Sequence, residues 1–208
     1  MADAICLGEL LIDFVPTVTG TGLTDAPAFI KAPGGAPGNV AVGLARLGVS
    51  SAFMGKVGDD AFGHFLANTL AETGVDVSPL RFATEARTAL AFVSLRADGE
   101  REFMFYRHPS ADMLFNPREV DVEAINRAKL LHFGSISLIG EPSRGATLYA
   151  VDTARAAGCL ISYDPNLRLP LWPDANAARN GMLLGFKKAH IVKLSDDESE
   201  FLTGLGDL

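Results

Sequence analysis

The second half of the sequence alternates short apolar runs with stretches of helical periodicity, and this alternation limits the possible folds more than any other feature. The apolar runs predict buried strands at residues 130–135, 159–163 and 191–194. The helical stretches span residues 122–127, 143–157, 175–186 and 196–202. Such alternation is typical of parallel strands joined by right-handed helical crossovers. We therefore expect an α/β fold with a parallel-rich central sheet flanked by helices.

A glycine-rich turn in the first half is a candidate ligand-binding segment. It reads Gly34-Gly35-Ala36-Pro37-Gly38-Asn39 and leads into a predicted helix at residues 38–47, followed by a strand at 51–57 and a helix at 61–73. Glycines leave no Cβ in the way of a ligand, and the unpaired N–H groups at a helix start point outward. Such a start could hold a phosphate or a ligand with several hydroxyl groups. The alternative is a turn that only connects a strand to a helix.

Two acidic residues follow the first predicted strand, which spans residues 4–8. They are Glu9, which we interpret as structural, and Asp13. Ligands of open α/β sheets bind beyond the carboxyl ends of strands, and a carboxylate accepts hydrogen bonds from two hydroxyl groups. A carboxylate at this position would suit a sugar, and the alternative for Asp13 is a solvated acid in a loop.

Two strand-like runs interrupt the helical alternation at residues 89–96 and 101–107. The segment between them contains Asp98-Gly99, which is a strong hairpin signal. Residues 14–33 are rich in Thr, Gly and Pro and favour a loop or an edge hairpin. A hairpin within an alternating chain suggests an inserted sheet.

Charge and composition argue against several classes of protein. The 208 residues have a net charge of −7, which argues against a nucleic-acid partner because no basic stripe could release counterions. No apolar run has the length of a membrane span, and the start lacks the pattern of a signal peptide. Cys6 and Cys159 lie in apolar runs, as buried thiols of a reducing compartment do. We expect one cytoplasmic domain.

Two polar clusters directly follow predicted strands in the second half. The first is Asp164-Pro165-Asn166-Leu167-Arg168, and the second is Lys193-Leu194-Ser195-Asp196-Asp197-Glu198. Polar groups at the carboxyl ends of parallel strands face the ligand crevice. The alternatives are an ordinary βα loop for the first cluster and a capping box between Ser195 and Glu198 for the second.

These motifs together resemble those of the ribokinase-like (PfkB) carbohydrate kinases. The first signature is the glycine-rich turn with its helix and strand, followed by Gly58-Asp59-Asp60-Ala61-Phe62-Gly63. Residues 105–112 and 164–172 are similar to motifs of the fructokinase and ketodeoxygluconate kinase subgroup, with the fructokinases most similar. The resemblance implies a Rossmann-like, three-layer ribokinase-like fold, present in part as one domain over residues 1–208. It also implies a small β-sheet lid formed by residues of about 14–33 and 87–112.

The resemblance implies ATP-dependent phosphorylation of a sugar hydroxyl, most simply of fructose to fructose 6-phosphate, with ATP and Mg²⁺ as cofactors. The sugar ligands that it implies are Asp13, Gly34, Gly35, Asn39, Arg107 and Asp112. The groups on the phosphate side are Asn166, Arg168 and Lys193, with Arg168 as the catalytic residue, and Glu198 would reach Mg²⁺ through water. The sequence departs from the family pattern at Ser195, where the family has Asn. An alternative for Arg107 is a surface ion pair with Asp112 or Glu102.

The resemblance also implies a second signature, Gly-Ala-Gly-Asp, whose aspartate is the general base. No segment of the 208 residues matches it, so we expect the base beyond Leu208 and no kinase activity from these residues alone. The alternative functions are a ketodeoxygluconate or nucleoside kinase of the same fold, or a non-catalytic sugar-binding relative. A small lid sheet exposes an apolar face unless it is covered, which predicts a homodimer through the lids.

Overall fold

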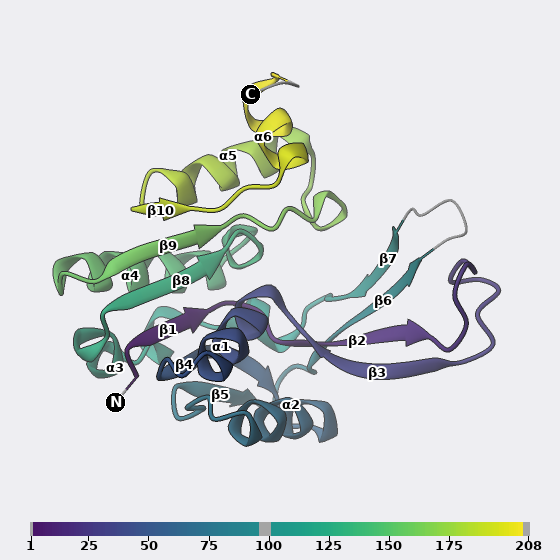
Figure 1. Ribbon diagram of the computed structural model, residues 1–208, viewed down its shortest axis with the longest axis horizontal. Helices are drawn as coiled ribbons and strands as arrows, with labels where there is room; N and C mark the ends of the chain where they lie inside the picture. Colours follow the sequence, from purple (N-terminus) through teal and green to yellow (C-terminus); the bar gives the residue numbers. More distant parts are fainter. Residues whose placement is uncertain (1, 96–100, 206–208) are drawn as a thin grey trace.

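The computed structural model describes residues 2–95 and 101–205, and in that part of the chain it contains two β-sheets (Figure 1). The larger sheet has the strand order β10-β9-β8-β1-β4-β5, and all its paired strands are parallel. Its strands are β1 (Ala4–Leu7), β4 (Ser51–Gly58), β5 (Leu80–Ala83), β8 (Leu130–Gly134), β9 (Leu160–Asp164) and β10 (Ile191–Val192). The parallel α/β architecture predicted from the alternation of elements is therefore confirmed.

Helices cover both faces of the larger sheet and make it the middle of three layers. Because successive strand residues point to opposite faces, Cys6 belongs to one apolar core and its neighbour Leu7 to another. The core around Cys6 includes residues of α1 (Ala36–Arg46) and α2 (Ala61–Glu72). The core around Leu7 includes residues of α3 (Val122–Arg127), α4 (Ser143–Ala156) and α5 (Ala175–Phe186), and α6 (Asp196–Thr203) follows β10.

The smaller sheet, which we call the lid, projects from the larger one as an arm (Figure 1). Its strands are β2 (Leu11–Pro16), β3 (Phe29–Gly34), β6 (Ala89–Leu95) and β7 (Arg101–Tyr106), in the order β3-β2-β6-β7. β6 and β7 pair in antiparallel register, as the predicted hairpin requires, while the Asp98-Gly99 turn lies outside the described residues. Two segments far apart in the sequence thus form one sheet.

Some elements differ from the sequence-based predictions. β10 has two residues rather than four, and among the residues that the structure describes it pairs with β9 alone. The helix α1 begins at Ala36, where Pro37 suits the first helical turn. The short strand β5 was not predicted, since its sequence Leu-Arg-Phe-Ala has too few residues to show a period.

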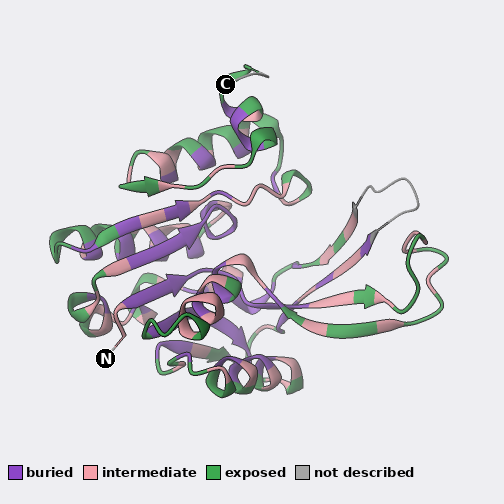
Figure 2. Cartoon of the chain, viewed as in Figure 1, coloured by how far each residue is buried: buried purple, intermediate pink, exposed green. Residues whose placement is uncertain are grey.

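The burial pattern follows the layers (Figure 2). Strands of the larger sheet are mostly buried, whereas the ends of β2 and β3 far from this sheet are largely exposed. Cys6 and Cys159 are buried free thiols, as predicted. Within residues 2–95 and 101–205, no helix is long and apolar enough to span a membrane.

Candidate functional site

A cavity of about 250 Å³ lies where the lid meets the carboxyl ends of β1 and β9, and we call it the central cavity. Residues from five separate parts of the chain surround it: the segment after β1, the start of α1, the lid strands, the segment after β8 and the loop after β9. Its lining residues are Glu9, Leu11, Asp13, Val15, Gly35, Ala36, Asn39, Val93, Phe103, Phe105, Ile136, Asn166 and Arg168. The position agrees with the rule that ligands of open α/β sheets bind beyond the carboxyl ends of strands.

Asp13 points from a lid strand into the central cavity. It lies in β2 opposite Ala32 and is half-buried, so its alternative interpretation as a solvated loop acid is wrong. Burial raises the pKa of the Asp13 carboxyl, and the nearby Arg168 guanidinium opposes this shift. The carboxylate is an acceptor that could receive hydrogen bonds from two ligand hydroxyl groups.

The glycine-rich turn joins β3 to α1 at the edge of the same cavity. Gly35 is the N-cap residue of α1 and has φ 105°, a conformation that other residues rarely adopt. Asn39, in the first turn of α1, lies at the exposed mouth of the cavity. Gly34 does not line the cavity but packs directly against the Asp13 carboxylate. The turn therefore gives the cavity wall the backbone of Gly35 and the side-chain amide of Asn39, and Gly34 leaves space for the Asp13 carboxylate.

Glu9 also lines the central cavity, although the sequence favoured a purely structural role for it. Its side chain is 3% exposed, and Oε1 accepts a hydrogen bond of 3.1 Å from the N–H of Ala36. Burial raises the pKa of Glu9 to about 7. Glu9 directly follows the first strand, and residues at the carboxyl ends of strands face the ligand in this class of fold. This position was the sequence signal that Glu9 would line a ligand cavity.

Asn166 and Arg168 lie in the loop after β9 and connect the central cavity with a second hollow. Asn166 has a positive φ of 47°, and its N–H donates to Oδ1 of Asp164 at 3.1 Å. The Arg168 guanidinium lies 5.3 Å from the centre of the Phe103 ring, within the range of a cation–π contact. Its Nη1 donates to the carbonyl oxygen of Leu167 at 2.9 Å.

The second hollow, which we call the polar groove, has a volume of about 330 Å³ and lies between this loop and the start of α6. It is lined by Asn166, Leu167, Arg168, Lys193, Ser195, Asp197 and Glu198. The exposed Lys193 ammonium group lies 3.2 Å from the Asp164 carboxylate. The predicted residues of the phosphate side are therefore brought together by the fold.

Glu198 is held by backbone groups on both of its carboxylate oxygens. Oε2 accepts from the N–H of Ser195 at 2.9 Å, which together with the Ser195 hydroxyl completes the predicted capping box. Oε1 accepts from the N–H of Leu167 at 2.7 Å and so ties α6 to the loop after β9. Only the remaining lone pairs of this buried carboxylate could face a ligand or a water molecule.

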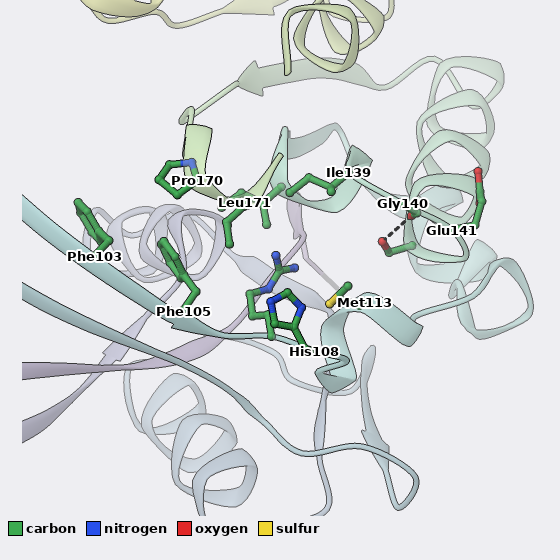
Figure 3. A pocket seen from close by; sticks show the side chains of 12 residues that line it. Phe103, Phe105, His108, Met113, Ile139, Gly140, Glu141, Pro170 and Leu171 are labelled. Carbon is green, nitrogen blue, oxygen red and sulfur yellow. Dashed lines mark hydrogen bonds between the residues drawn. The ribbon is translucent and has the colours of Figure 1, made fainter. Parts of the chain in front are cut away.

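Arg107 and Asp112 lie beside the central cavity rather than in its wall. Arg107 lines a flanking cavity of about 180 Å³, where Phe103 and Phe105 of the lid face Pro170 and Leu171 (Figure 3). Its guanidinium forms an ion pair with Asp112, including a hydrogen bond of 3.1 Å from Nε to Oδ2. Both side chains are buried. The alternative prediction of an ion pair between Arg107 and Asp112 is therefore confirmed, but its prediction that the pair lies on the surface is wrong.

The second half of the first signature joins the lid to the larger sheet. Asp60 caps α2 by accepting from the N–H groups of Phe62 and Gly63, and it also accepts from the hydroxyl and the N–H of Thr88 at 2.8 and 2.9 Å. Burial alone would raise the pKa of Asp60, but these hydrogen bonds outweigh it and the pKa is lowered. The signature aspartate thus fixes the point where the second lid segment begins.

The comparison with known proteins places almost the whole chain in a family. The sequence profile of the pfkB family carbohydrate kinases matches residues 1–207. The chain belongs to this family. Probable fructokinase-4 of Arabidopsis thaliana is 60% identical over 200 residues, which cover 96% of this chain and 61% of the plant protein.

Solved structures of two bacterial fructokinases have the same fold. The fructokinase of Xylella fastidiosa with bound ATP has a TM-score of 0.88 at 37% identity, covering 98% of this chain and 64% of that one. The fructokinase of Vibrio cholerae O395 with bound fructose, ADP and calcium ion has a TM-score of 0.86 at 35% identity, covering 98% and 63%. This chain spans about three fifths of the length of the curated relatives it matches. It covers 61% of probable fructokinase-4 and 59% of probable fructokinase-7 of Arabidopsis thaliana.

The aromatic wall of the central cavity was not predicted as part of the site. Phe103 and Phe105 lie two residues apart on β7, so both point to the cavity face, and their rings stack at 5.8 Å. The period-2 pattern showed only that they share a face of a strand. Which face would meet a ligand depends on how the lid packs on the larger sheet.

Proposed function

We propose that this chain supplies the sugar side and part of the phosphate side of a kinase that converts fructose to fructose 6-phosphate with ATP. The observation that carries the proposal is the position of Asn166 and Arg168. Both line the central cavity together with Asp13 and Asn39, and both line the polar groove together with Lys193 and Glu198. A phosphoryl acceptor in the cavity and a phosphoryl donor in the groove would therefore meet at this loop.

Each residue has a role that its chemistry supports. Asp13 accepts hydrogen bonds from sugar hydroxyl groups, and Asn39 and the N–H of Gly35 hold others. Arg168 stabilises the negative charge that spreads over the phosphoryl oxygens during transfer. Asn166 orients groups on both sides, and Lys193 pairs with a nucleotide phosphate. Gly34 acts through Asp13, Arg107 meets the sugar only at the edge shared with the flanking cavity, and Asp112 acts through its ion pair with Arg107.

ATP and Mg²⁺ are proposed as cofactors because relatives of this fold are described with ATP, with ADP and with a calcium ion. In the ranges that the structure describes, no three or more His, Cys, Asp or Glu residues are grouped as a metal site. A kinase Mg²⁺ ion needs only one or two carboxylates, because water and nucleotide phosphates complete its coordination. Glu198 fits that limited role through water, since both of its oxygens already accept backbone hydrogen bonds.

The closest rival activities use the same cavity with another phosphoryl acceptor. A ketodeoxygluconate kinase or a nucleoside kinase would need the central cavity to hold a keto acid or a nucleoside, and a sugar-binding relative would not transfer phosphate. The test is a chimaera of residues 1–207 with the remaining length of the Arabidopsis relative, assayed for ADP release with each acceptor. We expect fructose to give the highest kcat/KM. A higher kcat/KM with a keto acid or a nucleoside would overturn the assignment. If none of the acceptors causes ADP release, the result would favour the non-catalytic relative.

A lid-to-lid homodimer is a further part of the proposal. Val15 and Ile30 pair across β2 and β3 on the cavity side of the lid and are 44% and 61% exposed. Apolar side chains exposed to this degree on a projecting sheet favour cover by a second copy. We also propose that the protein acts as a single domain in the cytoplasm, which buried free thiols support. Sedimentation at micromolar concentration tests the dimer, and a monomer would contradict it.

A further inference from the structure

Glu9 has one carboxylate oxygen that the protein itself does not use. Oε1 accepts from the N–H of Ala36, but Oε2 is buried and has no hydrogen-bond partner among the described residues. A buried acceptor without a hydrogen-bond partner destabilises the folded state, and native proteins rarely leave one without a reason. Since the side chain lines the central cavity, a ligand there is an available partner.

The surroundings of Glu9 decide what kind of ligand atom suits Oε2. Gly35, Ala36 and Asn39 of the α1 start lie beside it in the cavity wall, and Asp13 lines the same cavity from β2. Two acidic side chains in one small cavity favour a ligand rich in hydrogen-bond donors over an anionic one. A cation is less suitable, because the Arg168 guanidinium already occupies one wall.

Several charged groups act on the Glu9 carboxyl. Burial is the largest influence on its pKa and raises it. The backbone N–H of Glu9 itself and the Arg107 guanidinium lower the pKa, the Asp112 carboxylate raises it, and the Ala36 N–H lowers it slightly. Arg107 and Asp112 neutralise each other in their buried ion pair. Asp13 and Arg168 are the other charged groups that line the central cavity. A new hydrogen-bond donor at Oε2 would therefore lower the pKa of the Glu9 carboxyl.

We propose that Glu9 binds the sugar directly, with Oε2 accepting a hydrogen bond from a ligand hydroxyl group that Asp13 does not hold. The proposal rests on the proposed function, because it assumes that the central cavity holds a sugar. A hydroxyl group that donates to a carboxylate stabilises the charged form. Sugar binding then shifts Glu9 toward its ionised form and releases a proton near neutral pH.

The test is calorimetric titration of the 208-residue chain with fructose at pH 6, 7 and 8, in two buffers that differ in ionisation enthalpy. For the wild-type chain we expect proton release at pH 6 to 7 and affinity about tenfold weaker at pH 6 than at pH 8. Glu9→Gln keeps the size of the side chain and an oxygen for the Ala36 N–H. It should bind about tenfold more weakly at pH 8, with little pH dependence. Glu72→Gln, on the exposed end of α2, is the matched control and should behave as wild type.

The possible outcomes separate this proposal from the function on which it rests. Wild-type binding of fructose without proton release, together with unchanged binding by Glu9→Gln, would overturn the role of Glu9 and leave the sugar site intact. Absence of binding by the wild-type chain to fructose and to other sugars would overturn both. If pH dependence persists in Glu9→Gln but disappears in Asp13→Asn, the titrating group is Asp13 and the proposal for Glu9 fails. Because proton release is measured on the wild-type chain, poor folding of a variant does not remove the test.

Discussion

Gly34 and Asp13 lie so close together that any side chain at Gly34 would overlap the Asp13 carboxylate. A Cβ atom built on Gly34 would lie 2.7 Å from Cγ of Asp13 and 2.9 Å from Cδ1 of Leu11. The two residues come from neighbouring strands of the lid, β3 and β2. The first glycine of the turn therefore sets the position of an acidic side chain in the central cavity.

This contact predicts that Gly34→Ala impairs sugar use by displacing Asp13. We expect kcat/KM for fructose in the chimaera to fall about 10- to 100-fold, the range for loss of a hydrogen-bond partner inside a site. The matched control is Gly43→Ala in α1, where a Cβ meets no atom within 4 Å. That control should retain activity and gain slightly in stability, because Ala is the better helix former. Equal activity of both variants would show that the Gly34 contact has no function.

Asp13→Ala and Asn39→Ala should each lower kcat/KM for fructose by about 10- to 100-fold, mainly through KM. Each change leaves a ligand hydroxyl without its partner, which costs about 1–3 kcal/mol. Steady-state kinetics of the chimaera measure the effect. Asp25→Ala, at an exposed position of the lid, is the control that should not change either constant. Unchanged kcat/KM in both site variants would remove these residues from the sugar site.

Arg168→Lys should lower kcat more than it raises KM. Lysine keeps the positive charge but loses the planar fork of donors that matches phosphoryl oxygens. We expect a fall in kcat of about 100-fold, similar to the loss of one donor that stabilises transition-state charge. Arg179→Lys, on the exposed side of α5, is the control. A variant with normal kcat and a raised KM for fructose would assign Arg168 to ground-state binding instead.

The buried Glu9 carboxyl predicts that stability falls as pH rises toward neutrality. Its pKa is raised from 4.5 to about 7 in the folded protein, so the folded state binds more protons than the unfolded state between these values. The contribution is fully present below pH 4.5 and is lost as pH rises through 7, with a total of about 3 kcal/mol. Urea unfolding of the wild-type chain and Glu9→Gln at pH 5 and pH 8 measures it. The variant should lose less stability between the two pH values, and an equal loss in both would contradict the assignment.

Local patterns in the sequence were sufficient to predict the layers of the fold and the loop that carries Asn166 and Arg168. Strand and helix periodicity depend on neighbouring residues, and the Asp-Pro-Asn turn follows its strand directly. The position of a loop at the carboxyl end of a parallel strand then follows from the fold class. The capping box of Ser195 and Glu198 was predicted in the same local way.

The environment of single side chains could not be predicted in this way. The sequence did not show that Glu9 is buried in the cavity wall, because that depends on the approach of the glycine-rich turn 27 residues later. It also did not show that the Arg107–Asp112 ion pair is buried, since no local pattern distinguishes a buried ion pair from an exposed one. Such features arise from packing between segments far apart in the chain.

We propose that the glycine-rich turn and the loop after β9 face one sugar molecule in the central cavity, the turn from the sugar side and the loop from the phosphate side. The most direct measurement is a fructose titration of the isotope-labelled 208-residue chain, followed by amide NMR signals. We predict that the signals of Gly35 and Asn39 and those of Asn166 and Arg168 shift together with one dissociation constant, while signals of α4 do not move. Shifts in only one of the two segments, or two different dissociation constants, would contradict the claim.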